Sequence, residues 1–186
     1  MVNSNENLNT TFTALFKDAV KAEQAYNLAL QKGYKKEDIN ILMSEETKKK
    51  NYGTQISDIG TNNGMGHKLM EGAGAGVGGA IGTTTGAIAG AIAAIGTTLV
   101  LPGLGLVIAG PLAAGLAGAG AGGIAGGLLG ALVNTGFSEN YAKDYENALK
   151  EGGIVISVIS HSKDENLSLE NEWKNYGGTN FLHTQV

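Results

Sequence analysis

Apolar and polar residues alternate near the start of the chain in a pattern that predicts a β-α-β unit. In TTFTALFK, residues 10–17, the two kinds of side chain largely alternate, which is typical of a strand. A helix is expected between Asp18, a suitable N-cap, and Gly33, which can adopt the left-handed conformation that ends helices. The apolar run at 39–43 predicts a second strand after this helix.

The last part of the chain repeats the same kinds of element. Ser138 can cap a helix over 139–150, and the glycine pair that follows can end this helix. The run IVISVI at 154–159 is rich in β-branched residues and predicts a strand. A helix over about 164–176 and a final strand at 179–183 are expected after it.

Together these elements predict an α+β protein. The order is β-α-β, then a glycine-rich region, then α-β-α-β, which fits a small ferredoxin-like α/β sandwich of four strands. A small doubly wound parallel sheet is the alternative, because strand order cannot be read from the sequence. Each strand is short, so the two ends of the chain must combine their apolar residues into one core.

Between the two ends the character of the chain changes. Residues 72–138 carry no charged side chain, and 21 of the 30 glycines lie there. All the acidic and basic residues lie outside this stretch. The chain is therefore expected to have five parts: a disordered N-terminus at 1–9, the first half of the α/β domain at 10–47, a polar linker at 48–71, a glycine-zipper helical hairpin at 72–136 and the second half of the α/β domain at 137–186.

Glycines recur every four residues in this uncharged region, in two separate rows. Residues four apart lie on one face of a helix, so each row predicts a smooth face that a second backbone can approach closely. Two helices are expected, over about 72–101 and 111–133, with a tip at 104–109. The helix-packing residues of the two rows are Gly74, Gly78, Gly82, Gly86, Gly90, Gly118, Gly122, Gly126 and Gly130. The residues that shape the hairpin tip are Pro102, Gly103, Gly105, Gly110 and Pro111.

The first of these helices also carries a stripe of branched aliphatic residues. We expect the stripe to face lipid or a neighbouring subunit, away from the glycine row. Its members are Val77, Ile81, Ile88, Ile92, Ile95 and Leu99.

Each glycine-rich helix is long enough to cross a bilayer, for which about 20 residues suffice. The few central aliphatic residues supply only about −2 to −4 kcal/mol of insertion free energy, so insertion of a single helix is marginal and insertion of a paired hairpin is feasible. The lysines that flank the region place both termini in the cytoplasm if the hairpin inserts. These lysines are Lys48, Lys49, Lys50, Lys68 and Lys143. The expected location is the cytoplasmic membrane, and the alternative is the cytoplasm.

Composition and motifs argue against several kinds of chemistry. The net charge of −4 and the lack of a basic stripe with interleaved aromatic residues give no reason to expect nucleic-acid binding. Two GxGxxG matches, at 74–79 and 118–123, have neither a preceding strand nor the acidic residue that would hold a ribose. The three histidines have no metal-ligand spacing, and the chain contains no cysteine. We therefore expect no catalytic, cofactor-binding or metal-binding residues and no small-molecule substrate.

Four short motifs carry a resemblance to a known family. They are PGLG at 102–105, AGPLA at 109–113, YENAL at 145–149 and the glycine pair at 152–153. With these motifs, residues 10–183 resemble the bacterial general-stress and low-temperature-induced proteins, which pair a heat-induced-stress-type α/β domain with a glycine-zipper segment. The resemblance implies induction under stress and no established enzymatic activity.

The sequence thus predicts a non-enzymatic stress-response protein. Its glycine-zipper hairpin is expected to mediate homo-oligomerisation in or on the cytoplasmic membrane, so its partners are copies of itself and membrane lipid. The alternative is a soluble homo-oligomeric scaffold, a ring, tube or bundle built by hairpin packing without membrane insertion.

Overall fold

The computed structural model describes residues 10–60, 87–94, 98–101, 105–113, 130, 133, 138–160 and 163–185. The segment 1–9, predicted to be disordered, lies outside these residues, as does most of the predicted glycine zipper. The strands are β1 (Thr10–Phe16), β2 (Ile39–Ser44), β3 (Thr98–Leu101), β4 (Leu106–Ala109), β5 (Ile154–Ser160) and β6 (Thr179–Gln185). The helices are α1 (Ala19–Gln31), the 3₁₀ turn η1 (Lys36–Asp38), α2 (Glu45–Gly60), α4 (Ala87–Ala94), α7 (Glu139–Lys150) and α8 (Lys163–Asn175).

The elements predicted for the two ends of the chain are confirmed, and the class is α+β. The Asp18 side chain accepts a hydrogen bond from the Lys21 amide at 3.0 Å and so caps α1 as expected. Gly33, at φ +95°, takes the left-handed conformation just beyond the end of α1. Ser138 stands at the N-cap of α7 but its side chain makes no capping hydrogen bond.

The strands form one six-stranded sheet in the order β3-β4-β2-β5-β1-β6. Every neighbouring pair is antiparallel, so the doubly wound parallel alternative is wrong. Strands β2 and β5 lie at the centre, with Ile41 opposite Ile156. The sheet has two strands more than the four predicted, and both extra strands come from the region expected to be a helical hairpin.

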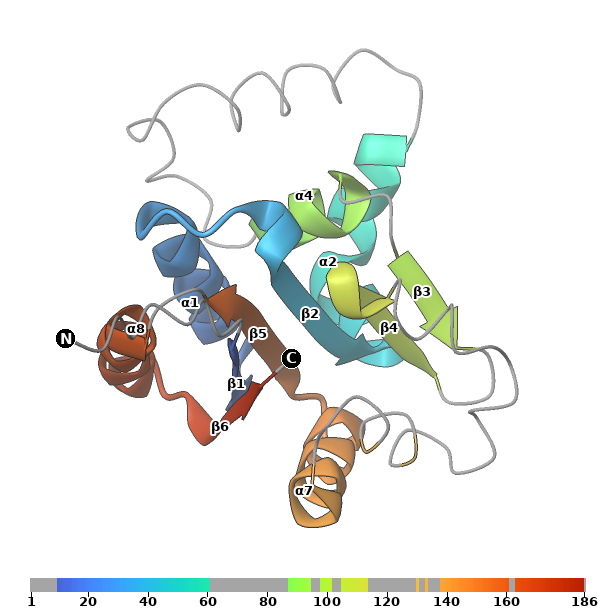
Figure 1. Ribbon diagram of the computed structural model, residues 1–186. Coiled ribbons are helices and arrows are strands. Elements are labelled where there is room, and N and C mark those ends of the chain that lie inside the picture. The colour runs from blue at the N-terminus through green and yellow to red at the C-terminus, as the bar shows by residue number, and fades with distance from the viewer. Residues whose placement is uncertain are drawn as a thin grey trace, which may run out of the picture.

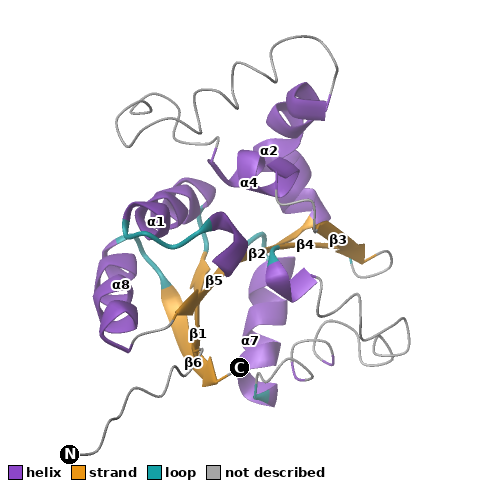
Figure 2. Cartoon of the chain, turned by 45° about the horizontal axis from the view of Figure 1, so that its top comes forward, coloured by secondary structure: helices purple, strands orange, loops and turns teal. Residues whose placement is uncertain are grey.

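Helices cover both faces of the sheet (Figure 1). On one face α1, α2, α4 and α8 pack over the larger core, which includes Phe12, Ile41 and Ile156. On the other face α7 packs over a smaller core around Leu15 and Val155. Figure 2 shows α1 and α8 on the side of the sheet away from α7. The two faces follow from strand alternation, since successive side chains point to opposite sides.

Trp173 of α8 anchors the larger core. Its ring is fully buried and stacks on Phe12 at a centroid distance of 5.1 Å, while Phe16 meets it edge-on at 5.4 Å. Its indole Nε1–H donates to the Ala25 carbonyl at 3.0 Å, which ties α8 to α1. The polar end of the largest core side chain is therefore satisfied while its ring contributes apolar area.

The predicted polar linker at 48–71 is wrong for its first half, because α2 continues to Gly60. The Ser44 hydroxyl accepts a hydrogen bond from the Thr47 amide at 3.0 Å and caps the first turn. Two glutamates follow Ser44 and suit the positive end of the helix dipole. Tyr52 is the one large side chain of α2 that is buried among those described. A helix that buries so few apolar side chains shows little apolar periodicity in its sequence.

The predicted hairpin tip is also wrong. Residues 106–109 form β4, a strand hydrogen-bonded to β2 and β3, and all four side chains are buried. Leu106 and Ile108 pack in the core under α7, while Val107 and Ala109 pack in the core on the other face. Residues 98–101, expected in the first helix, form the edge strand β3. A strand buried on both faces lacks alternation, so its apolar run resembled a membrane segment.

The described ends of the two glycine-rich segments do not pack on one another. Helix α4 lies within the first predicted helix, but it packs against α2 and α1. Its Ile88 and Ile92 are buried in the larger core, so the expectation that they face lipid or another subunit is wrong. The start of the second segment, at Leu112 and Ala113, packs in the core on the opposite face.

Candidate functional site

Two of the nine predicted helix-packing glycines lie among the described residues. Gly90 is in the middle of α4 and is half-buried, and Gly130 is a helical residue, also half-buried. A Cβ added to Gly90 would meet no atom of the described residues within 4 Å. The side of α4 that carries Gly90 is therefore open, while the isoleucines of the same helix face the core. The other seven glycines, Gly74, Gly78, Gly82, Gly86, Gly118, Gly122 and Gly126, lie outside the described residues.

Three of the predicted tip residues are described, and they lie against the sheet. The Gly105 carbonyl accepts a hydrogen bond from the Glu45 amide at 2.6 Å, which joins the start of β4 to the start of α2. Gly110 follows β4 at φ +107°, and Pro111 begins a helical turn. Pro102 and Gly103 lie outside the described residues. These three residues therefore lie within the α/β body, which is the sheet with the helices packed on it.

Helix α4 is attached to the body by Glu23, a fully buried residue of α1. Its carboxyl oxygens accept hydrogen bonds at 3.2 Å from the Ala87 and Ile88 amides, the first two of α4. These amides have no partner within the helix, so the carboxyl satisfies them and also meets the positive end of the helix dipole. Burial nevertheless raises the pKa of Glu23 to about 7, and the two amide hydrogen bonds offset part of that shift.

Two tyrosines share this buried region. Tyr26 of α1 and Tyr52 of α2 are fully buried in the same core, and neither hydroxyl has a hydrogen-bond partner among the described residues. Burial, with a further contribution from the charge of Glu23, raises the pKa of both phenols. Glu23 therefore sits among neutral groups in a poorly solvated part of the protein.

A second buried side chain, Asn40 of β2, holds the start of the other glycine-rich segment. Its Oδ1 accepts a hydrogen bond from the Leu112 amide at 2.6 Å, and its Nδ2 donates to the Ser157 hydroxyl at 3.1 Å. Gly110 makes this contact possible, because a Cβ there would lie 2.5 Å from the Ile39 carbonyl oxygen. Both glycine-rich segments are thus fixed at a helix start by a buried polar side chain of the body, on opposite faces of the sheet.

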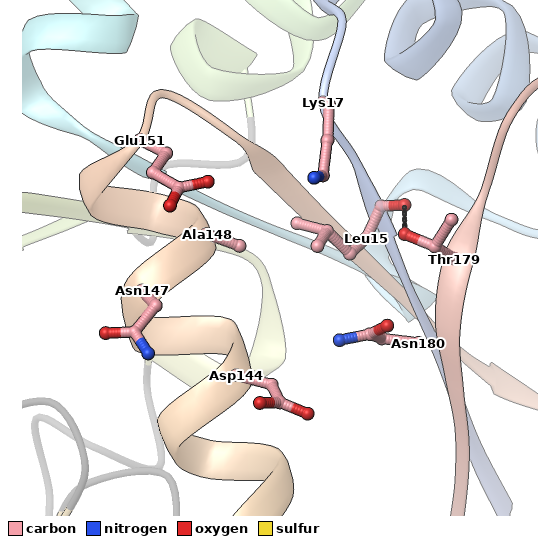
Figure 3. Close-up of a pocket in the computed structure, with 8 residues that line it drawn as sticks. All are labelled: Leu15, Lys17, Asp144, Asn147, Ala148, Glu151, Thr179 and Asn180. Carbon is pink, nitrogen blue, oxygen red and sulfur yellow. Dashed lines mark hydrogen bonds between the residues drawn. The ribbon is translucent and has the colours of Figure 1, made fainter.

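An open groove of about 320 Å³ lies between α7 and the strands β1 and β6 (Figure 3). It is lined by Leu15, Lys17, Asp144, Asn147, Ala148, Glu151, Thr179 and Asn180. The backbone at its floor is fixed, since the Tyr145 hydroxyl donates to the Asn180 carbonyl. One ammonium and two carboxylates line the groove, and this excess of negative charge disfavours an anionic ligand.

Sequence reasoning missed Glu23 and Asn40, although both left a signal. Glu23 lies three residues before Tyr26 on the helix face that also carries Ala22, so its burial follows from helical spacing. Asn40 interrupts the apolar run INILM, and an amide at a buried strand position requires a partner. The partners themselves were not readable, because they come from residues more than 60 positions away.

No family model, curated protein or solved structure matches the chain. Within the described part of the chain, no helix has both the length and the apolar character needed to cross a bilayer. In the same residues, no three histidine, aspartate or glutamate side chains gather as metal ligands would.

Proposed function

We propose that the protein is a non-enzymatic stress-response protein in which an α/β body holds glycine-rich segments for homo-oligomerisation. The order β2-β5-β1-β6 supports a ferredoxin-like unit for the body, extended at one edge by β4 and β3. The resemblance to bacterial general-stress proteins supports a role under stress. In this arrangement the body positions the segments, and the glycines supply the surfaces that associate.

The two sides of α4 carry this proposal. Ile88 and Ile92 bind the helix to the body, while Gly90 lies on the open side, where no described atom comes within 4 Å of an added Cβ. Glycine lowers helix stability by about 1 kcal/mol relative to alanine, so its presence at an unpacked helical position calls for another role. A second backbone that approaches closely at Gly90 provides that role.

Of the two forms of self-association predicted from the sequence, the geometry favours the scaffold. The isoleucines that a membrane hairpin would turn toward lipid are already buried against α1 and α2. Helix α4 and the turn at Leu112 and Ala113 lie on opposite faces of the sheet, which does not favour their pairing as one hairpin across a bilayer. The membrane form remains the alternative, supported by the uncharged stretch of residues 72–138.

The test compares two helical glycines. Gly90→Leu adds a side chain on the open face of α4. Gly53→Leu adds the same side chain to α2, where an added Cβ lies 3.7 Å from Lys49 Cγ. Sedimentation velocity should show a smaller assembly for Gly90→Leu, because the bulky side chain prevents close approach of a second backbone. The Gly53→Leu assembly should match that of the wild type, and circular dichroism should show both variants folded.

The same preparations decide between scaffold and membrane. A scaffold remains in the high-speed supernatant after carbonate extraction of cell membranes, whereas an inserted hairpin stays in the pellet. If the wild type sediments as a monomer, the homo-oligomer proposal is wrong. If Gly90→Leu assembles like the wild type, the proposed packing role of Gly90 is wrong.

A further inference from the structure

The join between α4 and the body depends on one carboxyl group. Glu23 is fully buried, and the partners shown for its carboxyl are the Ala87 and Ile88 amides. Among the described residues no lysine, arginine or histidine forms an ion pair with it. When α4 lifts away, the carboxyl loses both amides and is uncovered to water. The protonation state of Glu23 and the docking of α4 are therefore coupled.

We propose that Glu23 is a proton-controlled latch, which keeps α4 docked on α1 and α2 while the carboxyl is protonated and loosens α4 when the carboxyl ionises. The latch concerns docking within one chain, so it holds or fails independently of whether the glycine-rich segments associate.

The direction follows from burial. An ionised carboxylate loses its hydration in the docked state, and two neutral amides restore only part of that stabilisation. The pKa of Glu23 is accordingly raised from 4.5 to about 7 when α4 covers it. The pKa of Glu23 is higher when α4 is docked than when α4 is open. The protonated carboxyl therefore stabilises docking fully below the open-state pKa of 4.5, and this stabilisation is lost as the pH rises through the docked-state pKa of about 7. Docking therefore weakens between pH 4.5 and pH 7.

The groups around Glu23 do not reverse this direction. Tyr26 faces it from α1 and Tyr52 from α2, and burial raises the pKa of both, so both are neutral between pH 5 and pH 8. The acidic side chains that act on these tyrosines are Glu37 of η1 and Asp18 before α1. Neither acid shifts the pKa of Glu23, which is set by burial and by the two amide hydrogen bonds.

Thiol labelling in the full chain can test the latch, because the protein has no cysteine of its own. An Ile92→Cys variant places a thiol on the buried side of α4, and Val20→Cys gives an exposed reference for intrinsic thiol reactivity. Both are labelled with dithiodipyridine between pH 5 and pH 8. Relative to the reference, labelling of Cys at 92 should rise about 70-fold over this range, as a shift in pKa from 4.5 to about 7 requires.

The same measurement is repeated in a Glu23→Gln background, where the side chain is neutral at every pH. The rise should then disappear and the thiol should stay protected throughout. In the matched control Glu37→Gln the rise should persist, because the first two amides of α4 donate to Glu23 and not to Glu37. An equal rise in Glu23→Gln, or labelling that falls with pH, would overturn the latch.

A second measurement does not depend on the cysteine variants. Titration of the Glu23 carboxyl carbon by NMR in the wild-type chain should give a midpoint close to pH 7. Amide hydrogen exchange of Ala87 and Ile88, corrected for intrinsic rates, should lose protection over the same pH range. A midpoint at the ordinary glutamate value would show that α4 does not control the carboxyl, and the latch would be rejected.

Discussion

A pair of glycine substitutions tests whether residues 105–113 belong to the sheet. Gly110 and Gly33 both have positive φ, at +107° and +95°, so alanine strains the backbone at both positions by about 1–3 kcal/mol. Only at Gly110 does the added Cβ also collide, 2.5 Å from the Ile39 carbonyl oxygen and 2.9 Å from Asn40 Oδ1. At Gly33 it meets no atom within 4 Å in the part of the chain that the structure describes. The collision should add about 1–3 kcal/mol to the strain, as overpacking does in protein cores.

Urea denaturation gives the two free energies of unfolding. Trp173 is the single tryptophan and is fully buried, so its fluorescence reports unfolding of the body without a label. Gly33→Ala should lower the free energy of unfolding by about 1–3 kcal/mol, and Gly110→Ala by about 2–6 kcal/mol. Equal slopes with urea would show that the difference lies in the folded state.

The comparison can refute the reasoning in two ways. If Gly110→Ala costs no more than Gly33→Ala, the segment after β4 is not held against β2 at Ile39 and Asn40. If Gly110→Ala leaves stability unchanged, residues 105–113 lie away from the body, as the tip of a helical hairpin would. The second result would restore the arrangement predicted from the sequence.

Three further changes probe named contacts. Asn40→Ala leaves the buried Leu112 amide without an acceptor and should cost about 1–3 kcal/mol by urea denaturation, whereas Asn40→Asp keeps that acceptor and should cost less. Glu170→Gln should lower stability by less than about 1 kcal/mol at pH 6, and this effect should shrink as the pH falls. Its lysine and histidine partners lower the pKa of Glu170, so its stabilisation exists above the unfolded pKa and is lost as the pH falls through the folded value. Trp173→Phe should cost about 1–3 kcal/mol, seen by thermal melting, because the Ala25 carbonyl loses its donor in the core.

The sequence identified those elements whose signals are local. Strand alternation, an N-cap and a glycine stop lie within one element, and all three are present at α1 and the strands around it. The same holds for β5, whose β-branched run is bounded by the glycine that precedes it and by α8. Strand order depends on which backbones pair across the sheet, and no local signal encodes that pairing.

The elements that were mispredicted depend on distant partners. Helix α2 is polar because its described part buries one large side chain, Tyr52, and its start had to be recognised from the Ser44 cap alone. Strand β4 is apolar at every position because cores lie on both sides of it, and in sequence this resembles a membrane helix. The lack of charge in residues 106–109 does indicate burial, but these residues are buried in a sheet and not in a membrane helix.

The two buried caps show how the antiparallel-sheet body holds the described helix starts of the glycine-rich region. A helix rich in glycine has low intrinsic stability, and its first amides are the hardest to satisfy. Here Glu23 supplies acceptors to the start of α4, and Asn40 supplies one to the turn that begins at Pro111. These two helix starts therefore lie on opposite faces of the sheet. Association of matching faces from different chains is compatible with this geometry, and it requires no rearrangement of the body. We therefore propose that the glycine faces associate between molecules and not within one.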